Sequence, residues 1–279
     1  MVDYLSWFEF LGRNSQEFGI VITGYDVYSS PKRDTSTVKI PYLNSEVIQS
    51  NGRFENVSVS YHCVLLPHTQ WYNFEQQINT VKLWLNGSVD DYSELKDSYN
   101  TNVYRMAYFN GEIKPTQQGT VWGFDIVFSC EPFRYGMENE QTVTISENGL
   151  LLPLNNYNAY MGIPLITVYP ASGATAMTFT LNDTDWFIVS NKKTFIDSKI
   201  GKVYDIDGNF RFYHNGNAET FIAPKGMPLL NNGENTLEIS APVTSGISQI
   251  TVLKRWCYLC SLFFVTVILS TNHYSRKLC

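Results

Sequence analysis

Hydrophobic residues in this chain recur mostly at every second position, and this period limits what the chain can fold into. A period of two is typical of a β-strand with one buried face, because successive side chains point to opposite faces. Gly, Asn, Asp and Pro separate the alternating segments, as expected of turns between short strands. The sequence therefore predicts a mainly β protein with strands at Phe18–Thr23, Asn56–Leu65, Trp122–Cys130, Thr142–Ile145, Leu165–Tyr169, Met177–Leu181, Phe210–Tyr213, Leu237–Ile239 and Ile247–Leu253.

One segment departs from this period and predicts a helix over about 74–85. Its apolar side chains share one face of a 3.6-residue period, namely Phe74, Ile78, Val81 and Leu85. Asn73 is suited to cap the start of this helix, and Gly87 is suited to end it. A shorter helical piece is expected at Tyr92–Lys96.

The length and the strand pattern together predict two domains. A chain of 279 residues exceeds the roughly 100–150 residues of a typical domain. The best boundary is Glu131–Gln141, because a strand is expected to end at Cys130 and a polar run with Pro132 and Gly136 follows. We expect an N-terminal β-rich domain over 1–136 and a β-sandwich over 141–259. Within the sandwich, Asp207-Gly208 predicts a two-residue hairpin turn of type I′.

The last 20 residues, 260–279, differ from the rest of the chain. They contain no acidic residue, and they follow an apolar run, Trp256–Leu269, that is shorter than the ~20 residues of a membrane helix. We expect an appendage that belongs to neither domain, with a short membrane-associating tail as the alternative. The N-terminus lacks the basic and apolar regions of a signal peptide, so none is expected. Without this appendage, which carries one Lys and one Arg, the formal charge changes from −6 to −8.

Motifs that would carry chemistry are absent from the sequence. It contains no G-x-S-x-G, H-E-x-x-H or Walker A pattern, so we expect no enzyme, no cofactor and no metal site. His62, Cys63 and His68 could in principle bind zinc, but neighbouring residues of a strand point to opposite faces, which favours Cys63 as a core residue. Asp205–Asn209 resembles part of a calcium loop, yet a hairpin turn explains the same residues. Cys257-x-x-Cys260 has no second cysteine pair.

The overall composition favours extended protein contacts over binding to nucleic acid. With 20 Lys and Arg against 26 Asp and Glu, broad non-specific binding to nucleic acid is not expected. Aromatic residues make up 15% of the chain and charged residues only 16%, a balance that fits large interfaces. A sandwich core rich in Tyr and Phe would account for part of the same composition.

Short motifs follow one another in an order and spacing that carry a resemblance. In the first half they are Asn14-Ser-x-x-Phe18-Gly19-Ile20-Val21, Pro31-Lys-Arg33, Ile40-Pro41, Asn51-Gly52-Arg53-Phe54-x-Asn56-Val57-x-Val59-x-Tyr61, Trp84-Leu85-x-Gly87, Tyr92-x-x-Leu95-x-Asp97 and Phe124-x-Ile126-x-Phe128-x-Cys130-x-Pro132-Phe133-x-Tyr135. In the second half they are Ala159-x-x-Gly162-x-Pro164-Leu165-Ile166-x-Val168, Pro228-x-Leu230-x-x-Gly233-Glu234-Asn235-Thr236-Leu237 and Ile250-x-Val252-x-x-Arg255-Trp256. Together they resemble the distal tail protein of siphophages and related prophages of Gram-positive hosts, over about residues 7–258.

The chain departs from this family at two places. Family members often carry Pro-Gly-Arg-(Asn/Asp)-Gly where this chain has Pro41-Tyr42-Leu43-Asn44-Ser45, so this turn is expected to differ. Family members also usually stop soon after the Arg255-Trp256 element, which leaves 260–279 outside the family pattern.

The resemblance implies a fold and a role. The N-terminal domain would carry a protruding hairpin within Ser30–Phe54 and form a ring, and the second domain would be a galectin-like β-sandwich. Six copies would form a homo-hexameric hub at the phage tail tip, assembled in the host cytoplasm. The hub would join the tail tube protein to the baseplate and meet the tape-measure protein, the tail-associated lysin and receptor-binding proteins. The interface residues expected on this basis are Arg33, Ile40, Tyr42, Leu43, Ile48, Arg53 and Phe54.

The resemblance also bears on ligands. DNA would pass through the channel of the ring without specific binding, and no membrane partner is expected. The alternative function is a carbohydrate-binding module that contributes to adsorption on the host cell wall. A cell-wall hydrolase is a third hypothesis, for which the sequence has no motif.

Overall fold

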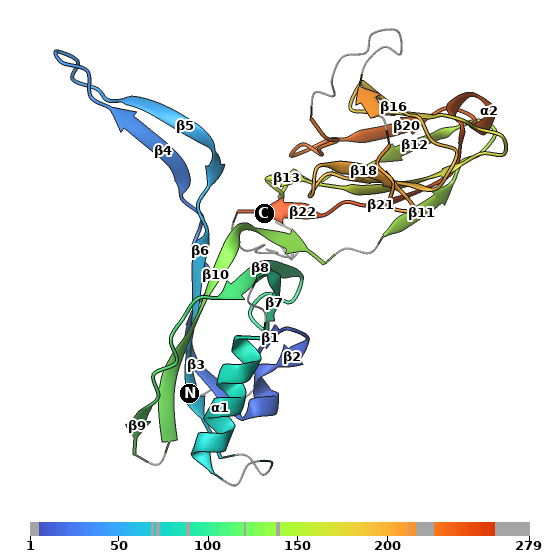
Figure 1. The fold of residues 1–279 in the computed structure, drawn as a ribbon. Helices are drawn as coiled ribbons and strands as arrows, with labels where there is room; N and C mark the ends of the chain where they lie inside the picture. The colour runs from blue at the N-terminus through green and yellow to red at the C-terminus, as the bar shows by residue number, and fades with distance from the viewer. Residues whose placement is uncertain are drawn as a thin grey trace, which may run out of the picture.

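The computed structural model is mainly β, as the sequence predicts (Figure 1). It describes residues 6–67, 70, 73–87, 90–119, 121–137, 140–211, 213–215 and 226–259. The expected appendage 260–279 and His68 lie outside these residues. Within the described ranges, the helices are too short or too polar to cross a lipid bilayer.

A ten-stranded sheet forms the first half of the structure, with strand order β13-β22-β10-β8-β7-β1-β2. Strands β6 and β9 also pair with β10, and β3 pairs with β6. The longest strand, β10, thus holds the sheet together. The bounds are β1 Phe8–Phe10, β2 Arg13–Asn14, β3 Ile20–Asp26, β6 Val57–Leu65, β7 Ser93–Asp97, β8 Val103–Phe109, β9 Thr116–Gln118, β10 Val121–Gly136, β13 Met161–Gly162 and β22 Trp256–Tyr258, with a 3-10 helix at Ser15–Phe18.

Helix α1, Phe74–Leu85, covers one face of this sheet and confirms the predicted helix. The Asn73 side chain caps it by accepting a hydrogen bond from the Gln76 N–H at 2.9 Å. The predicted face is buried at Ile78, Val81 and Leu85, whereas Phe74 is half-buried. Trp84 completes the contact, since its indole N–H donates to the Phe10 carbonyl at 2.9 Å and its ring stacks on Phe8 and Phe18.

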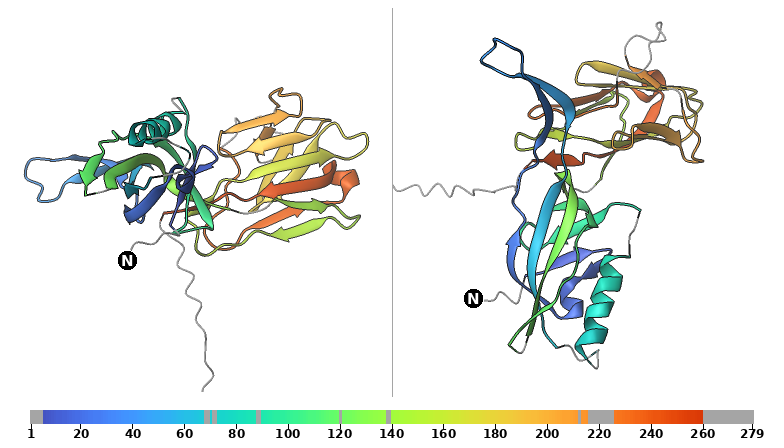
Figure 2. Two further views of the ribbon diagram at one scale, coloured as in Figure 1. Left: turned by 90° about the horizontal axis from the view of Figure 1, so that it is seen from below. Right: turned by 60° about the vertical axis from the view of Figure 1, so that its left-hand side comes forward.

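Two five-stranded sheets form the second half and face each other as a β-sandwich (Figure 2). One has the order β11-β21-β14-β17-β18 and the other β12-β20-β15-β16-β19. Alternate residues of both sheets fill the core between them. The bounds are β11 Gln141–Thr144, β12 Leu150–Pro153, β14 Leu165–Pro170, β15 Met177–Leu181, β16 Thr184–Ile188, β17 Thr194–Asp197, β18 Lys202–Asp205, β19 Tyr213–Asn215, β20 Thr236–Ile239 and β21 Ile247–Leu253, with a short helix α2 at Pro242–Ser245.

Strand β10 does not end at Cys130, which corrects the sequence prediction. It continues to Gly136, with a break in the register against β8 between Cys130 and Arg134. Pro132 lies in this break. A proline has no N–H group to donate to a neighbouring strand, and it is tolerated here because the strands do not pair within the bulge. After the sandwich the chain returns, and β22 pairs with both β10 and β13. The division into domains 1–136 and 141–259 stays a prediction.

Three local predictions are wrong. Tyr92–Lys96 is not helical, because β7 pairs there with β1 and β8. Phe210–Tyr213 is not one strand, since Phe210 forms a bridge with Tyr204 in one sheet while β19 pairs with β16 in the other. Asp207-Gly208 is not a type I′ turn, because only Gly208 of the two has a positive φ, 81°.

The two-residue turn with positive φ at both positions lies elsewhere, at Asn182-Asp183 between β15 and β16. Their φ values are 49° and 60°, the signs that a type I′ turn requires. The Asn182 side chain supports this turn by donating to the Asn235 side chain at 2.8 Å and accepting from the Thr236 N–H at 3.0 Å. Asparagine tolerates a positive φ better than most residues, which explains why an asparagine occupies position 182.

Candidate assembly surface

The hairpin implied by the resemblance is present within Ser30–Phe54. Strands β4 (Arg33–Val38) and β5 (Val47–Phe54) pair only with each other and form a two-stranded sheet. This hairpin projects from the rest of the molecule in every view (Figures 1 and 2).

Both faces of the hairpin are open to solvent. Its large apolar side chains are 45–107% exposed, and they are Val38, Ile40, Tyr42, Leu43, Val47 and Ile48. An isolated two-stranded hairpin is only marginally stable in water, and several exposed apolar side chains on one projecting element are typical of a contact site. The hairpin is therefore the strongest candidate for an assembly surface on the described chain.

The tip of the hairpin holds a strained tyrosine. The Leu43 N–H donates to the Ile40 carbonyl at 3.1 Å, which closes a turn with Pro41 and Tyr42 at its centre. Tyr42 has a φ of 71°, as the third residue of a type II turn requires, but that position favours glycine. Its ring is fully exposed. The turn thus keeps a glycine-like backbone while it presents an aromatic ring.

A polar clamp fixes the middle of the hairpin. The Asp34 carboxylate accepts hydrogen bonds from the Asn51 amide at 2.8 Å and from Arg53 Nε at 2.6 Å. Between these two donors, Gly52 has a φ of 74°, and the register of the strands shifts between Arg33 and Thr35. The hydrogen bonds from Arg53 and Asn51 hold the pKa of Asp34 below its ordinary value. The Asn51-Gly52-Arg53 motif therefore builds a bulge and aligns the two strands.

An aromatic cluster anchors the second strand of the hairpin at its root. The Phe54 ring makes edge contacts with Phe133 and Tyr160, with ring centroids 5.7 and 5.8 Å apart. Phe133 and Tyr160 stack on each other at 5.7 Å. The Arg33 guanidinium lies 5.7 Å from the centre of the Phe54 ring on the hairpin itself. Phe54 thus connects the hairpin to β10 and to the segment that leads into β13.

Two buried arginines hold the segment that leads into the first strand of the hairpin. Arg105 and Arg134 both donate to the carbonyl of Val27, and the Arg134 guanidinium lies 5.6 Å from the centre of the Tyr28 ring. Burial lowers the pKa of both arginines, that of Arg134 to about 10. Nearby, the Tyr61 hydroxyl donates to Asp97 at 3.1 Å. The hairpin is therefore held by β8 and β10 at its first end, and by β10 and Tyr160 at its second end.

The structure separates the predicted interface residues into two groups. Ile40, Tyr42, Leu43 and Ile48 are exposed side chains on the hairpin. Arg33, Arg53 and Phe54 contact residues of their own chain, as described above. Sequence reasoning missed Val38 and Val47, which face each other across the ladder and are about as exposed as Ile40. Their closeness in sequence to the predicted residues Ile40 and Ile48 could have indicated them.

Most charged side chains of the hairpin, Arg33 excepted, form ion pairs with other residues of the hairpin or its base. Lys32 lies 3.6 Å from Glu55, and Lys39 lies 3.5 Å from Glu46. Exposed pairs of this kind contribute little to stability. They leave the apolar side chains, rather than a net charge, as the distinctive property of the surface.

The described residues contain no group of three or more metal-ligating side chains. Cys63 is buried and His62 is exposed, as the strand alternation predicts. Cys63, Cys130 and Cys257 are free buried thiols, and burial raises the pKa of Cys130 and of Cys257 to about 12. The Asp205 side chain in the suspected calcium loop accepts bonds from the N–H groups of Asp207 and Asn209, as in a turn.

Comparison with known proteins identifies the fold. No protein-family model and no curated protein sequence matches the chain. The crystal structure of the Dit protein (gp 19.1) of phage SPP1 matches with a TM-score of 0.67 and 13% identity, covering 90% of this chain and 99% of that protein. The chain therefore has the fold of SPP1 Dit. That protein is described as a paradigm of the hub of the adsorption apparatus in phages that infect Gram-positive bacteria.

Two further matches are structures of the phage P2 baseplate in its activated conformation. The structure with calcium gives a TM-score of 0.44 at 8% identity, covering 91% of this chain and 98% of the matched one. The structure with strontium gives 0.41 at 9% identity, covering 90% and 98%. The Dit match, with 90% of this chain covered, confirms the mainly β fold implied by the ordered motifs.

Proposed function

We propose that this chain is a structural protein of a phage tail, a distal tail hub that forms a hexameric ring. The ring joins the tail tube to the baseplate and surrounds the channel through which DNA leaves. The observation that supports this role is the shared fold with SPP1 Dit over 90% of the chain. The resemblance of the ordered motifs, found without the structure, supports the same role.

The hairpin supplies the contact between subunits. A ring needs a head-to-tail contact whose rotation closes, and a projecting element that reaches the next copy provides one. Strands β4 and β5 each have one edge without a pairing partner among the described strands, so either edge can extend a sheet of the neighbour. Ile40, Tyr42, Leu43 and Ile48 would be buried in this contact, while the clamp and the root keep the hairpin aligned.

The acidic charge fits a channel that DNA crosses without binding. Met1–Leu259 carries a formal charge of −8, so a ring of six copies would carry about −48. Carboxylates that face the channel would repel the phosphate backbone. The partners of the ring would be the tail tube and tape-measure proteins, the tail-associated lysin and the receptor-binding proteins. This role needs no catalysis, and we expect no turnover of purified peptidoglycan.

Mass and symmetry test this proposal together. Light scattering coupled to size-exclusion chromatography of the full chain should give about six copies, and negative-stain microscopy should show six-fold rings. If assembly needs a partner, adding the tail tube protein of the same phage should produce the rings. A protein that stays monomeric over a wide concentration range, alone and with the tube protein, would contradict the proposal.

A further inference from the structure

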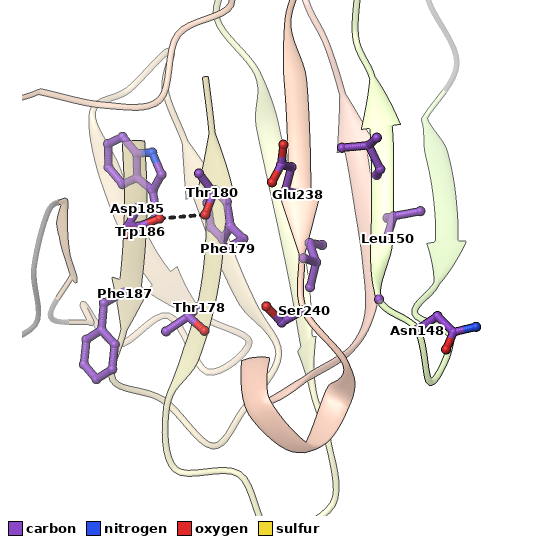
Figure 3. A pocket seen from close by; sticks show the side chains of 13 residues that line it. Asn148, Leu150, Thr178, Phe179, Thr180, Asp185, Trp186, Phe187, Glu238 and Ser240 are labelled. Carbon is purple, nitrogen blue, oxygen red and sulfur yellow. Dashed lines mark hydrogen bonds between the residues drawn. The ribbon is translucent and has the colours of Figure 1, made fainter. Parts of the chain in front are cut away.

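A hollow of about 580 Å³ lies on the outer face of the second sandwich sheet (Figure 3), and Figure 1 shows the strands of this sheet apart from the hairpin. Strands β12, β20, β15 and β16 form its floor. Their inward residues, such as Phe179, Trp186 and Ile239, are buried in the core. The alternate residues therefore point outward, and they line the hollow. Its size falls within the roughly 300–1,000 Å³ of ligand sites.

Polar side chains from three strands meet in the middle of this hollow. Thr178 and Thr180 come from β15, Asp185 from β16 and Glu238 from β20, with Ser240 just beyond β20 (Figure 3). The Thr180 hydroxyl donates to Asp185 at 2.6 Å, which holds this carboxylate in place. Hydroxyl groups donate and accept, whereas carboxylates only accept. These hydroxyl and carboxylate side chains therefore suit a ligand whose own groups both donate and accept hydrogen bonds.

Apolar surface flanks the polar centre on both sides. Phe187 of β16 is half-buried at one side, and Leu151 of β12, at the other, is 67% exposed. A sugar ring combines an apolar C–H face with a rim of hydroxyl groups. The aromatic ring and the leucine can cover such C–H faces, while the threonines and carboxylates bind the rim.

The charge of the lining decides between classes of glycan. No Lys or Arg lies among the described residues that line this hollow. A second hollow of about 360 Å³ shares Thr180 and Glu238 with it, and adds Asp183 and Glu234 with several asparagines but no cation. Phosphate-bearing or sulfated polymers would be repelled along the whole face.

We propose that this outer sheet face binds a neutral, hydroxyl-rich glycan chain that runs from the first hollow into the second. A basic peptide would bind the carboxylates mainly through its charge, so the salt dependence of binding distinguishes it from a neutral glycan. This binding activity is separate from ring formation, because none of the lining residues belongs to the hairpin or its root.

The experiment uses the full chain on a glycan array with neutral, amine-bearing and phosphorylated or sulfated oligosaccharides. Binding to neutral members and none to the phosphorylated or sulfated members is expected, and calorimetry with the strongest neutral oligosaccharide then measures affinity. Phe187→Ala and the double variant D185N/E238Q should each weaken it at least about tenfold. Binding should persist in about 0.5 M salt, where the Debye length is only about 3–8 Å.

Matched control variants distinguish a loss of binding at this sheet face from a loss caused by misfolding. Phe210→Ala removes an exposed phenylalanine elsewhere on the sandwich, and Glu112→Gln removes a carboxylate paired with Lys114 in the other half. Both should bind as the parent protein does, and circular dichroism should show all variants folded. The proposal is overturned if no neutral oligosaccharide binds, or if the controls lose as much affinity as the face variants. Binding only to an oligolysine peptide, lost in salt, would overturn it as well. Oligomeric mass, measured in parallel, reports on the ring separately.

Discussion

Tyr42 combines two properties that seldom occur together, a positive φ and a fully exposed aromatic ring. A left-handed backbone costs a non-glycine residue about 1–2 kcal/mol. Tyr42→Gly should therefore leave the melting temperature of the subunit unchanged or raise it. The same change should weaken assembly by several-fold, because the ring is lost from the tip. Sedimentation equilibrium measures the second effect, and thermal unfolding measures the first.

Tyr42→Ala is the control for this prediction. It removes the ring but keeps a side chain at the strained position, so it should weaken assembly without raising stability. If Tyr42→Gly assembled as tightly as the parent protein, the tip would have no part in the contact.

Asp205 should make the sandwich sensitive to acid. Burial raises the pKa of this carboxyl, but hydrogen bonds from Arg211 and Asn209 outweigh burial and lower the pKa to about 2 from an ordinary 3.8. Because the folded pKa lies below the unfolded one, the stabilisation is present above about pH 4 and is lost as the pH falls toward 2. Thermal unfolding across this range should show the loss. Asp205→Asn should melt lower at neutral pH and lose less on acidification.

Asp207→Asn provides the comparison, because it alters an exposed ion pair with Lys192 in the same loop. It should keep the acid sensitivity of the parent protein. An unchanged acid profile in Asp205→Asn would show that other groups cause the loss.

At the scale of single residues, the predicted interface residues divide according to whether they contact their own chain. Ile40, Tyr42, Leu43 and Ile48 are exposed on the hairpin, as an interface requires. Arg53 and Phe54 instead serve the hairpin itself. The partner of Arg53 is Asp34, on the opposite strand, and those of Phe54 are roughly 80 to 106 residues away. Contacts at such separations leave no local pattern that a reader of the sequence could follow.

At the scale of elements, the sequence predicts correctly those elements whose conformation depends on contacts within one segment of the chain. Helix α1 was predicted with its bounds and cap, since its cap and its apolar period lie within one segment. Strand β7 was mistaken for a helix, because its conformation depends on pairing with β1 and β8. The extension of β10 past Cys130 was missed for the same reason: Pro132 is acceptable only because the ladder is already broken there.

The aromatic root should control how firmly the hairpin is held. Phe133→Ala removes the ring that contacts both Phe54 and Tyr160. Since an exposed two-stranded hairpin is marginal by itself, amides of β4 and β5 should exchange with solvent faster in this variant. Hydrogen exchange followed by mass spectrometry measures this, while amides of β14 and β21 in the sandwich serve as an internal reference.

Phe210→Ala is the matched control, because Phe210 is exposed and lies away from the root. It should leave the exchange of the hairpin unchanged. Equal exchange in Phe133→Ala and the parent protein would show that the clamp and the two arginines suffice to hold the hairpin.

At the scale of the whole molecule, the two halves are joined by more than a linker. Strand β22 returns from the sandwich to pair with β10, and Lys199 of the sandwich lies 3.6 Å from Glu131 and 4.6 Å from the centre of the Tyr135 ring. No pattern in the sequence indicates this return, because β22 is only three residues long. The hairpin rises from the same junction, since its root contacts Phe133 and Tyr160. Strand β10 therefore connects the hairpin-bearing sheet to the sandwich.

The apolar side chains of the hairpin provide the decisive test of the assembly. Ile48→Asp and Leu43→Asp alter side chains that are 70% and 53% exposed, so the subunit should keep its stability to within about 0.5 kcal/mol. In the ring these carboxylates would be buried without a partner, at a cost of several kcal/mol across each contact. The double variant should therefore be monomeric by light scattering at concentrations where the parent protein forms rings. Ile206→Asp, at a position 59% exposed on the sandwich, should form rings normally. Rings formed by the double variant would move the subunit contact away from the hairpin, whereas loss of rings in Ile206→Asp alone would place it on the sandwich.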